Sequence, residues 1–162
     1  MSAVVEPLDK IMSWSRVAEW RRSRVGREAV VFTNGVFDLL HPGHIDVLLG
    51  ARGQGDALVV GVNSDDSVRR LKGPERPIRS AAERCYVLAA LEMVDAVVVF
   101  EQDTPLELIQ AVKPDVLVKG GDYDADRVVG AAEVRGWGGK VVIIPLTPGH
   151  STTTTIERLR AR

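Results

Sequence analysis

Short apolar runs alternate along the chain with segments in which apolar residues recur at helical spacing. Five of the runs are rich in valine, isoleucine and leucine and have no alternating polar face, which is typical of parallel strands buried on both sides. They span residues 29–32, 57–63, 96–100, 116–119 and 141–144. Because parallel strands need crossover connections, the pattern predicts an α/β fold: a single domain with a five-stranded parallel sheet and helices on both faces.

Two helices are predicted from capping boxes at their starts. Ser80 precedes Glu83, and Thr104 precedes Glu107 with Pro105 at the first helical position. Weaker periodicity predicts further helices over residues 13–24, 43–52, 65–71, 126–135 and 152–161. The basic, proline-rich segment 72–79 is predicted to be a loop and is a candidate lid over a ligand.

Length and composition narrow the class of protein. The 162 residues suit one domain, and 45% hydrophobic with 27% charged residues is ordinary for a globular protein. With 21 basic and 22 acidic residues the net charge is -1, so no overall field recruits nucleic acid or an anionic membrane. A small-molecule ligand is therefore favoured over either of these partners.

The cellular location is predicted from what the sequence lacks. Cys85 is the one cysteine, so no internal disulfide can form, which fits a reducing compartment. The first residues do not show the basic and then apolar pattern of an export signal, and no apolar run reaches the ~18 residues of a membrane span. These features predict a cytoplasmic protein, and the helical setting of Cys85 predicts a buried, unreactive thiol.

The segment after the first predicted strand, residues 33–44, carries the clearest candidate chemistry. Ligands of open α/β sheets bind beyond the carboxyl ends of strands, and this segment leaves one. Gly35 allows close backbone approach, and a helix that begins near Gly43 would direct free N–H groups at an anion. His41 and His44, three residues apart across that helix start, can donate to the same phosphate. The segment therefore predicts a phosphate site.

Other interpretations of these residues remain open. The two histidines could bind a metal with Asp38 or Asp46 as third ligand, or could be structural. Neither a dinucleotide-binding glycine fingerprint nor a P-loop fits the glycine positions. The acidic residues 122–133 have calcium-loop spacing, but Arg127 stands where that loop needs glycine. No metal-ligating residue is predicted.

Two motifs resemble those of a known superfamily. Residues 35–44, GVFDLLHPGH, closely resemble the H-x-G-H signature of the nucleotidylyltransferases, and residues 149–153, GHSTT, resemble their second signature. In that family a Ser-Thr-Thr begins the last helix and meets the nucleotide phosphates. The two motifs are more than 100 residues apart and stand in the family's order. The resemblance implies a Rossmann-like domain.

Further blocks resemble the heptose 1-phosphate adenylyltransferases within that superfamily. They lie at residues 32–44, 62–65, 71–73 with 76–77, 100–105, 117–123, 136–139 and 151–153. The resemblance begins near residue 28, so residues 1–27, which match nothing, are predicted to be an N-terminal helical extension and residues 28–162 the nucleotidylyltransferase domain. Many such modules are fused to a sugar kinase that has no counterpart here, so a separate kinase is expected, and the resemblance implies a homodimer.

The resemblance implies transfer of AMP from ATP to a sugar 1-phosphate, with D-glycero-β-D-manno-heptose 1-phosphate favoured, releasing pyrophosphate and forming an ADP-sugar. Mg2+ is expected to accompany ATP. One alternative is cytidylyl transfer to glycerol 3-phosphate or a related polyol phosphate, but those enzymes carry an arginine where this chain has Leu146. The other is a nucleotide-binding module that has lost catalysis.

The predicted site residues fall into three groups, placed by resemblance and by the loops that carry them. The catalytic group is His41, His44 and Lys72, in which Lys72 closes onto the triphosphate. The nucleotide-binding group is Thr33, Asn34, Gly35, Phe37, Gly43, Lys119, Gly120, Gly121, Asp122, Ser151, Thr152 and Thr153. The substrate-binding group is Asp38, Asn63, Arg76 and Arg79. Solvated loop charges, ordinary helix capping and turn formation are the competing interpretations of Lys72, Arg76, Arg79, Ser151–Thr153, Asp38 and Asp122.

Overall fold

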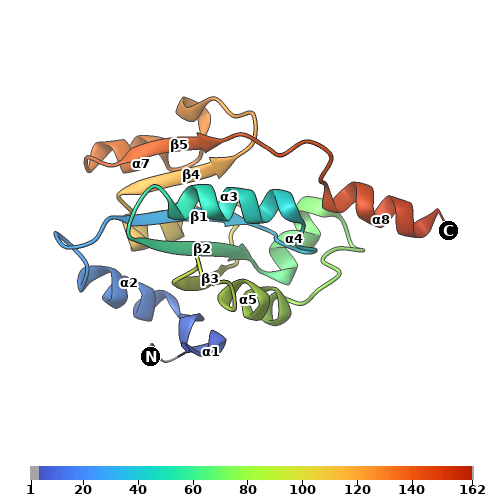
Figure 1. The fold of residues 1–162 in the computed structure, drawn as a ribbon, viewed down its shortest axis with the longest axis horizontal. Coiled ribbons are helices and arrows are strands. Elements are labelled where there is room, and N and C mark those ends of the chain that lie inside the picture. The colour runs from blue at the N-terminus through green and yellow to red at the C-terminus, as the bar shows by residue number, and fades with distance from the viewer. Residues whose placement is uncertain (1–3, 162) are drawn as a thin grey trace.

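A computed structural model describes residues 4–161. Its centre is a five-stranded sheet in the order β3-β2-β1-β4-β5, in which all neighbouring strands are parallel (Figure 1). The strands are β1 (Val30–Gly35), β2 (Ala57–Asn63), β3 (Ala96–Phe100), β4 (Val116–Gly120) and β5 (Lys140–Ile144). The predicted α/β fold and its strands are confirmed. The first strand runs past its predicted end because β1 keeps pairing with β2 as far as Gly35 opposite Val62.

Helices cover both faces of the sheet, and a separate apolar core lies under each. On one face α3 (Pro42–Arg52) and α5 (Ala81–Ala89) contribute Leu48, Cys85 and Leu88 to the core. On the other, the core includes residues of α2 (Trp14–Arg22), α6 (Leu106–Val112) and α7 (Ala131–Gly136). Burial raises the pKa of the Cys85 thiol to about 11, so the thiol is protonated at neutral pH.

The remaining helices lie at the edges of these layers. They are the short α1 (Pro7–Lys10), α4 (Asp65–Lys72), a 3-10 turn η1 (Ala125–Arg127) and α8 (Thr152–Arg160). The chain leaves β5 and crosses to α8, which projects beyond the carboxyl ends of the strands (Figure 1). Arg160 of α8 pairs with Glu75 in the loop after α4 at 2.7 Å. This crossing brings the last helix back to the loops that follow β1 and α4.

One predicted capping box is present and the other is not. Ser80 Oγ accepts a hydrogen bond from the N–H of Glu83, and the Glu83 carboxylate accepts one from the N–H of Ser80. The Thr104 box is wrong: α6 begins at Leu106 with Pro105 as the N-cap residue and no side-chain cap. The Glu107 carboxylate instead accepts a hydrogen bond from Gln102 Nε2.

The prediction of one continuous helix over residues 126–135 is also wrong, because the structure has two separate elements there, η1 and α7. Gly130 lies between them with φ +88°, a left-handed conformation that ends one helical segment before the next begins. A Cβ at this position would lie 2.7 Å from Ile109 Cδ1 of α6. The break therefore depends on glycine both for backbone conformation and for packing.

The N-terminal segment packs against the edge of the sheet. The N–H of Met12 donates to Val97 O of β3 at 2.9 Å, and Trp14 Nε1 donates to Val99 O at 2.9 Å. Arg21 of α2 is bound to Asp115, which precedes β4, at 3.0 Å. The described part of the segment thus covers the open edge of β3, while residues 1–3 lie outside the described residues. The division of the chain at residue 28 stays a prediction.

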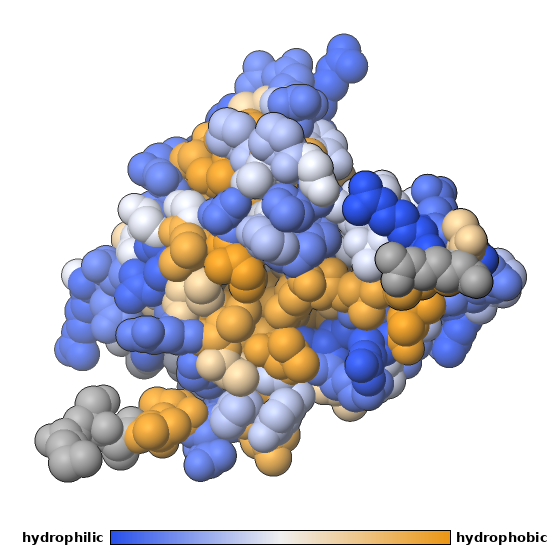
Figure 2. All heavy atoms as spheres, turned by 45° about the vertical axis from the view of Figure 1, so that its right-hand side comes forward, coloured by the Kyte–Doolittle hydropathy of each residue, from blue (hydrophilic) through white to orange (hydrophobic). Residues whose placement is uncertain are grey.

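Figure 2 shows an apolar area bordered by hydrophilic residues on the face that includes the carboxyl ends of the strands. An apolar groove lined by Leu8, Leu39, Leu40 and Val87 lies beside α5. Among residues 4–161, none of the helices has the length and apolar character required to cross a bilayer.

We predict that Gly130→Ala lowers the free energy of unfolding by about 3 kcal/mol, because a left-handed alanine costs ~1–2 kcal/mol and overpacking adds a similar amount. Gly138→Ala is the matched control, since Gly138 has φ +90° and a Cβ added there would meet no described atom within 4 Å. This control should cost only about 1 kcal/mol. Urea unfolding of the wild type and both variants measures the difference, and equal losses in the two variants would contradict it.

Candidate active site

A cavity opens where β1 and β4 separate. The two strands pair only at Val31 with Val116 and at Phe32 with Leu117, whereas β1 and β2 stay paired as far as Gly35. The connection after β1 leads to α3 on one face of the sheet, and the connection after β4 leads to α7 on the other face. Ligands of open α/β sheets bind at such a point. The cavity, about 450 Å³ and hereafter the first cavity, extends from the end of β1 to the starts of α3 and α8.

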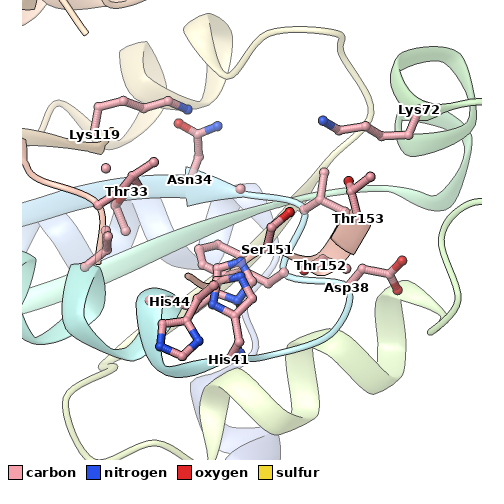
Figure 3. A pocket seen from close by; sticks show the side chains of 18 of the residues that line it. Thr33, Asn34, Asp38, His41, His44, Lys72, Lys119, Ser151, Thr152 and Thr153 are labelled. Atoms are coloured by element: carbon pink, nitrogen blue, oxygen red, sulfur yellow. Dashed lines mark hydrogen bonds between the residues drawn. The ribbon is translucent and has the colours of Figure 1, made fainter. Parts of the chain in front are cut away.

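Most of the predicted site residues line the first cavity, several of them drawn in Figure 3. They are Thr33, Asn34, Gly35, Phe37, Asp38, His41, Gly43, His44, Lys72, Arg76, Lys119, Gly120, Ser151, Thr152 and Thr153. They come from separate strands, helices and loops, so the fold rather than local sequence brings them together. Their functional roles stay predictions.

His41 and His44 are placed by the start of α3. His41 is the N-cap residue, and the His44 Nδ1 atom, one turn in, accepts a hydrogen bond from the N–H of His41 at 3.3 Å. The two rings stack with centroids 3.7 Å apart and planes at 18°. Because Nδ1 of His44 is an acceptor, the proton of the neutral ring lies on Nε2. That nitrogen is left to donate to a ligand.

Burial keeps these histidines neutral at pH 7. Burial lowers the pKa of His44 to about 4, and the neighbouring His41 acts in the same direction. The pKa of His41 is lowered by burial and then by the charge of His150. The Nδ1 atom of His41 is buried and has no partner among the described residues. A phosphate bound here would gain two imidazole donors and would favour their protonation.

His150 is a site residue that sequence reasoning did not assign. Its ring is nearly parallel to that of His41, with centroids 5.9 Å apart, and it lines the first cavity. All three histidines of the chain are therefore in one place. The signal was available, because His150 lies inside the second motif directly before Ser151. Within the described part of the chain, no group of three or more His, Cys, Asp or Glu residues is arranged to hold a metal ion.

The start of α8 lines the first cavity beside the histidines. Ser151 is the N-cap residue and its Oγ accepts from the N–H of Thr154 at 3.4 Å. Thr152 Oγ1 donates to Leu39 O in the loop after β1 at 3.2 Å, which fixes α8 beside the histidines. Ser151, Thr152 and Thr153 lie close to His41 and His44 in Figure 3. The first N–H groups of α8 are thus available to an anion at the place where the histidines lie.

Two lysines and an asparagine complete the wall formed by the sheet. Lys119 is near the end of β4, Asn34 is near the end of β1, and Lys72 is the last residue of α4 rather than part of a loop. Figure 3 shows both lysine side chains directed toward the space above Asn34. Gly120 is needed beside them, because a Cβ there would lie 2.6 Å from Val47 Cγ2 of α3.

Asp38 organises the predicted lid instead of lying free in the cavity. Its carboxylate is fully buried and accepts hydrogen bonds from Arg76 Nε at 2.8 Å and from the N–H groups of Ile78 and Arg79 at 2.9 and 2.8 Å. Burial alone would raise the pKa of Asp38, but these donors outweigh it and the pKa is lowered. The loop after α4 is therefore fastened to the loop after β1. A contact of Asp38 with acceptor hydroxyls stays a prediction.

Arg84 is a second residue that sequence reasoning missed. Its guanidinium is fully buried and donates to Val36 O at 2.7 Å, to Arg79 O at 3.0 Å and to the Asp65 carboxylate at 2.9 Å. It therefore holds together the loops that follow β1, β2 and α4. The only sequence signal was a charged residue inside the apolar pattern of α5.

Four predicted residues do not line the first cavity. Asn63 is buried, donates to Ser67 Oγ at 3.0 Å and borders an adjoining cavity. The Arg79 guanidinium pairs with Glu83 at 3.2 Å on the exposed side of α5. Gly121 donates its N–H to Ile144 O, and Asp122 is exposed. These four residues therefore lie outside the lining of the first cavity.

The fold and the site define a class of protein. The chain belongs to the cytidylyltransferase-like family, whose model matches residues 32–158. This confirms the resemblance drawn from the two motifs.

Individual relatives are identical to this chain at more than half of the aligned positions. The chain is 55% identical over 160 residues to the bifunctional protein HldE of Acidiphilium cryptum, an alignment that covers 95% of this chain and 32% of that protein. It is 52% identical over 164 residues to bifunctional protein HldE of Magnetococcus marinus, covering 99% of this chain and 33% of that protein. The chain thus spans about a third of the length of these relatives. Because the second alignment takes in almost the whole chain, the expectation that residues 1–27 match nothing is wrong.

Solved structures share the fold of this chain. The crystal structure of the lipopolysaccharide core biosynthesis protein from Thermoplasma volcanium is 30% identical with a TM-score of 0.60 and covers 74% of this chain and 97% of its own. The pantoate-beta-alanine ligase from Francisella tularensis has a TM-score of 0.58 at 16% identity, covering 85% of this chain and 68% of its own. The latter likeness concerns the fold alone.

We predict that stability rises between pH 5 and pH 7. In the unfolded chain His44 has its ordinary pKa of 6.5 and takes up a proton when the pH falls below that value. In the folded protein its pKa is about 4, so the ring stays neutral until the pH is more acidic. Protonation therefore favours the unfolded state at pH 5, by about 2 kcal/mol for this one group. The variant His44→Asn lacks the titrating ring, but its amide oxygen can still accept from the N–H of His41. Urea unfolding should therefore show that its free energy of unfolding differs between pH 5 and pH 7 by about 2 kcal/mol less than that of the wild type. The same pH dependence in variant and wild type would contradict the prediction.

Proposed function

We propose that the chain is an adenylyltransferase domain that transfers AMP from ATP to a sugar 1-phosphate, releasing pyrophosphate and forming an ADP-sugar. We name D-glycero-β-D-manno-heptose 1-phosphate as the acceptor. The observation that carries the proposal is the single cavity in which His41 and His44 at the start of α3 face Ser151–Thr153 at the start of α8. Identity at more than half of the aligned positions to the HldE proteins supports it.

The proposed mechanism uses positioning and charge. An oxygen of the sugar phosphate attacks the α-phosphorus of ATP, a new P–O bond forms, and the bond to the β-bridging oxygen breaks so that pyrophosphate leaves with that oxygen. No covalent bond to the protein is needed. The Nε2–H groups of His41 and His44 donate to the phosphates, Lys72 neutralises charge, and the first N–H groups of α8 hold the departing pyrophosphate.

Adenine is favoured over cytosine by the wall near the end of β4. Leu146 lines the first cavity together with Tyr123, so an apolar surface stands where cytidylyltransferases for glycerol 3-phosphate carry an arginine. An apolar and aromatic surface is suited to a purine ring.

Magnesium is proposed to arrive with the nucleotide. The one acidic residue among those that line the first cavity is Asp38, and its oxygens are already committed to Arg76 and to backbone N–H groups. The described residues therefore do not fit a protein-held magnesium, and we assign no step to it. When bound to the triphosphate, Mg2+ would reduce the repulsion between two anionic reactants.

The setting of the reaction is part of the same proposal. We place it in the cytoplasm, where ATP is available and where a single unpaired cysteine is in keeping with a reducing medium. The homodimer stays a prediction, because nothing among the described residues identifies what covers the apolar groove beside α5. The partnership with a sugar kinase also stays a prediction.

The proposal is tested by pyrophosphate release from the purified protein with Mg2+, combining ATP, CTP or GTP with heptose 1-phosphate or glycerol 3-phosphate. We expect release with ATP and heptose 1-phosphate alone. Release with CTP and glycerol 3-phosphate would replace the proposal with the cytidylyl alternative. No release in any combination, with ATP still raising the melting temperature, would indicate a binding module without catalysis.

We predict that His44→Asn keeps the fold but lowers kcat by at least ~100-fold, because the Asn amide occupies the place of Nδ1 and nothing replaces the Nε2 donor. His44→Gln is the complementary variant. Its amide can reach the position of Nε2 but not the N–H of His41, so it should keep more activity than His44→Asn and lose about 1 kcal/mol of stability. Steady-state kinetics and urea unfolding measure both properties, and wild-type turnover in His44→Asn would exclude His44 from the reaction.

A further inference from the structure

A second cavity adjoins the first and shares one wall with it. It has a volume of about 410 Å³, in the ~300–1,000 Å³ range of small-molecule sites. The shared wall is formed by residues 34–36 at the end of β1 together with Lys72, Lys119 and Tyr123. Any group bound at this wall is in reach of ligands in both cavities.

The shared wall is positively charged and its charges are not neutralised. None of the ion pairs within residues 4–161 includes Lys72 or Lys119. The acidic residues that line the two cavities are committed elsewhere, Asp38 to Arg76 and Asp103 to Arg70, each at 2.8 Å. Both lysine side chains point into the space above Asn34 (Figure 3). Two ammonium groups converging without a counter-ion form a site for an anion.

The electrostatics of Lys119 agree with this geometry. Burial and, after it, the charge of Lys72 lower the pKa of Lys119, so Lys72 makes the charged form of Lys119 less favourable. An anion bound between them would remove that penalty, and a dianion would match the two charges.

The outer walls of the two cavities differ, which indicates what each holds. The first cavity has the histidines and the start of α8, which suit a chain of phosphates. The second is lined by the polar residues Asn63 and Thr104 and by Arg127, whose side chain is 88% exposed and 3.9 Å from Asp124. Its lining also includes the apolar residues Leu71, Pro105, Val128 and Val129, against which the carbon skeleton of a ligand can pack. Amide, hydroxyl and guanidinium groups suit the hydroxyls of a polyol or sugar.

We infer that the second cavity is the acceptor subsite: it takes a polyhydroxylated molecule with a dianionic phosphate, which Lys119 and Lys72 hold at the shared wall beside the nucleotide. The inference rests on the proposed function and deepens it. It changes the role of Lys119 from binding nucleotide to binding the acceptor. Placed there, an oxygen of the acceptor phosphate lies next to the α-phosphorus, with the pyrophosphate directed away toward the histidines and α8.

The experiment measures the two ligands separately on the full chain. Wild type, Lys119→Met, Lys119→Arg and Arg127→Gln are titrated by calorimetry with α,β-methylene-ATP, and then with heptose 1-phosphate at saturating analogue. Lys140→Met is the matched control, because Lys140 is exposed and begins β5 at the opposite end of the sheet.

We expect Lys119→Met to weaken acceptor binding by at least ~10-fold, the loss typical of a charge-assisted hydrogen bond, while the affinity for the analogue changes less than ~3-fold. Lys119→Arg should recover part of the loss, and Arg127→Gln should weaken the acceptor alone. Lys140→Met should match wild type. The inference would be overturned if Lys119→Met lost as much affinity for the analogue as for the acceptor. It would also be overturned if the affinity of Lys119→Met for the acceptor were unchanged.

Inorganic phosphate separates failure of the inference from failure of the proposed function. If heptose 1-phosphate is not the acceptor, phosphate should still bind to the analogue-saturated wild type and not to Lys119→Met. If wild type turns over ATP and heptose 1-phosphate but Lys119→Met raises only the KM for ATP, the proposed function stands and the acceptor subsite is wrongly placed. Failure of both phosphate and heptose 1-phosphate to bind beside the analogue would also overturn the inference.

Discussion

The separation of β1 from β4 is the constraint on which the rest of the site depends. A strand in the middle of a parallel sheet has hydrogen-bonding partners on both sides, and β1 keeps its partner in β2 to Gly35 but pairs with β4 only near its beginning. The sheet is therefore open beyond Phe32 on one side of β1. Residues at the end of β1 line both cavities. The early end of the pairing between β1 and β4 therefore decides where ligands can bind.

Around that opening, buried polar groups hold the loops in one arrangement. Asp38 fastens the loop after α4, Arg84 joins three loops, and the N–H of His41 fixes the ring of His44. These groups are costly to leave unpaired, so each strongly disfavours other loop conformations. A site assembled in advance in this way suits a reaction in which the protein supplies position and charge instead of a covalent intermediate. The lysines differ, because their charges are left for a ligand to neutralise.

The alignments with relatives and the packing of the chain agree about the N-terminal segment. The family match covers residues 32–158, and the HldE relatives align over nearly the whole chain, including the N-terminal segment that covers the edge of β3. That segment contributes Met12 and Val17 to the core, so it belongs physically to the sheet it covers. Its presence in the alignments is in keeping with this packing, since an uncovered edge strand exposes backbone groups that would pair with other chains.

The sequence by itself determined the sheet, most helices and most residues of the first cavity, because continuous apolar runs, the Ser80 capping box and the two motifs are local signals. It did not determine that Gly130 divides a helix, that Gln102 takes the carboxylate of Glu107, or that Asp38 and Arg84 are occupied in holding loops. These depend on partners distant along the chain or on backbone conformation. Only the tertiary structure decided that His150 joins the other histidines and that Lys72 and Lys119, 47 positions apart in the sequence, meet at one wall. The crossing of separate elements at the carboxyl edge of the sheet, which no local pattern encodes, is the physical reason.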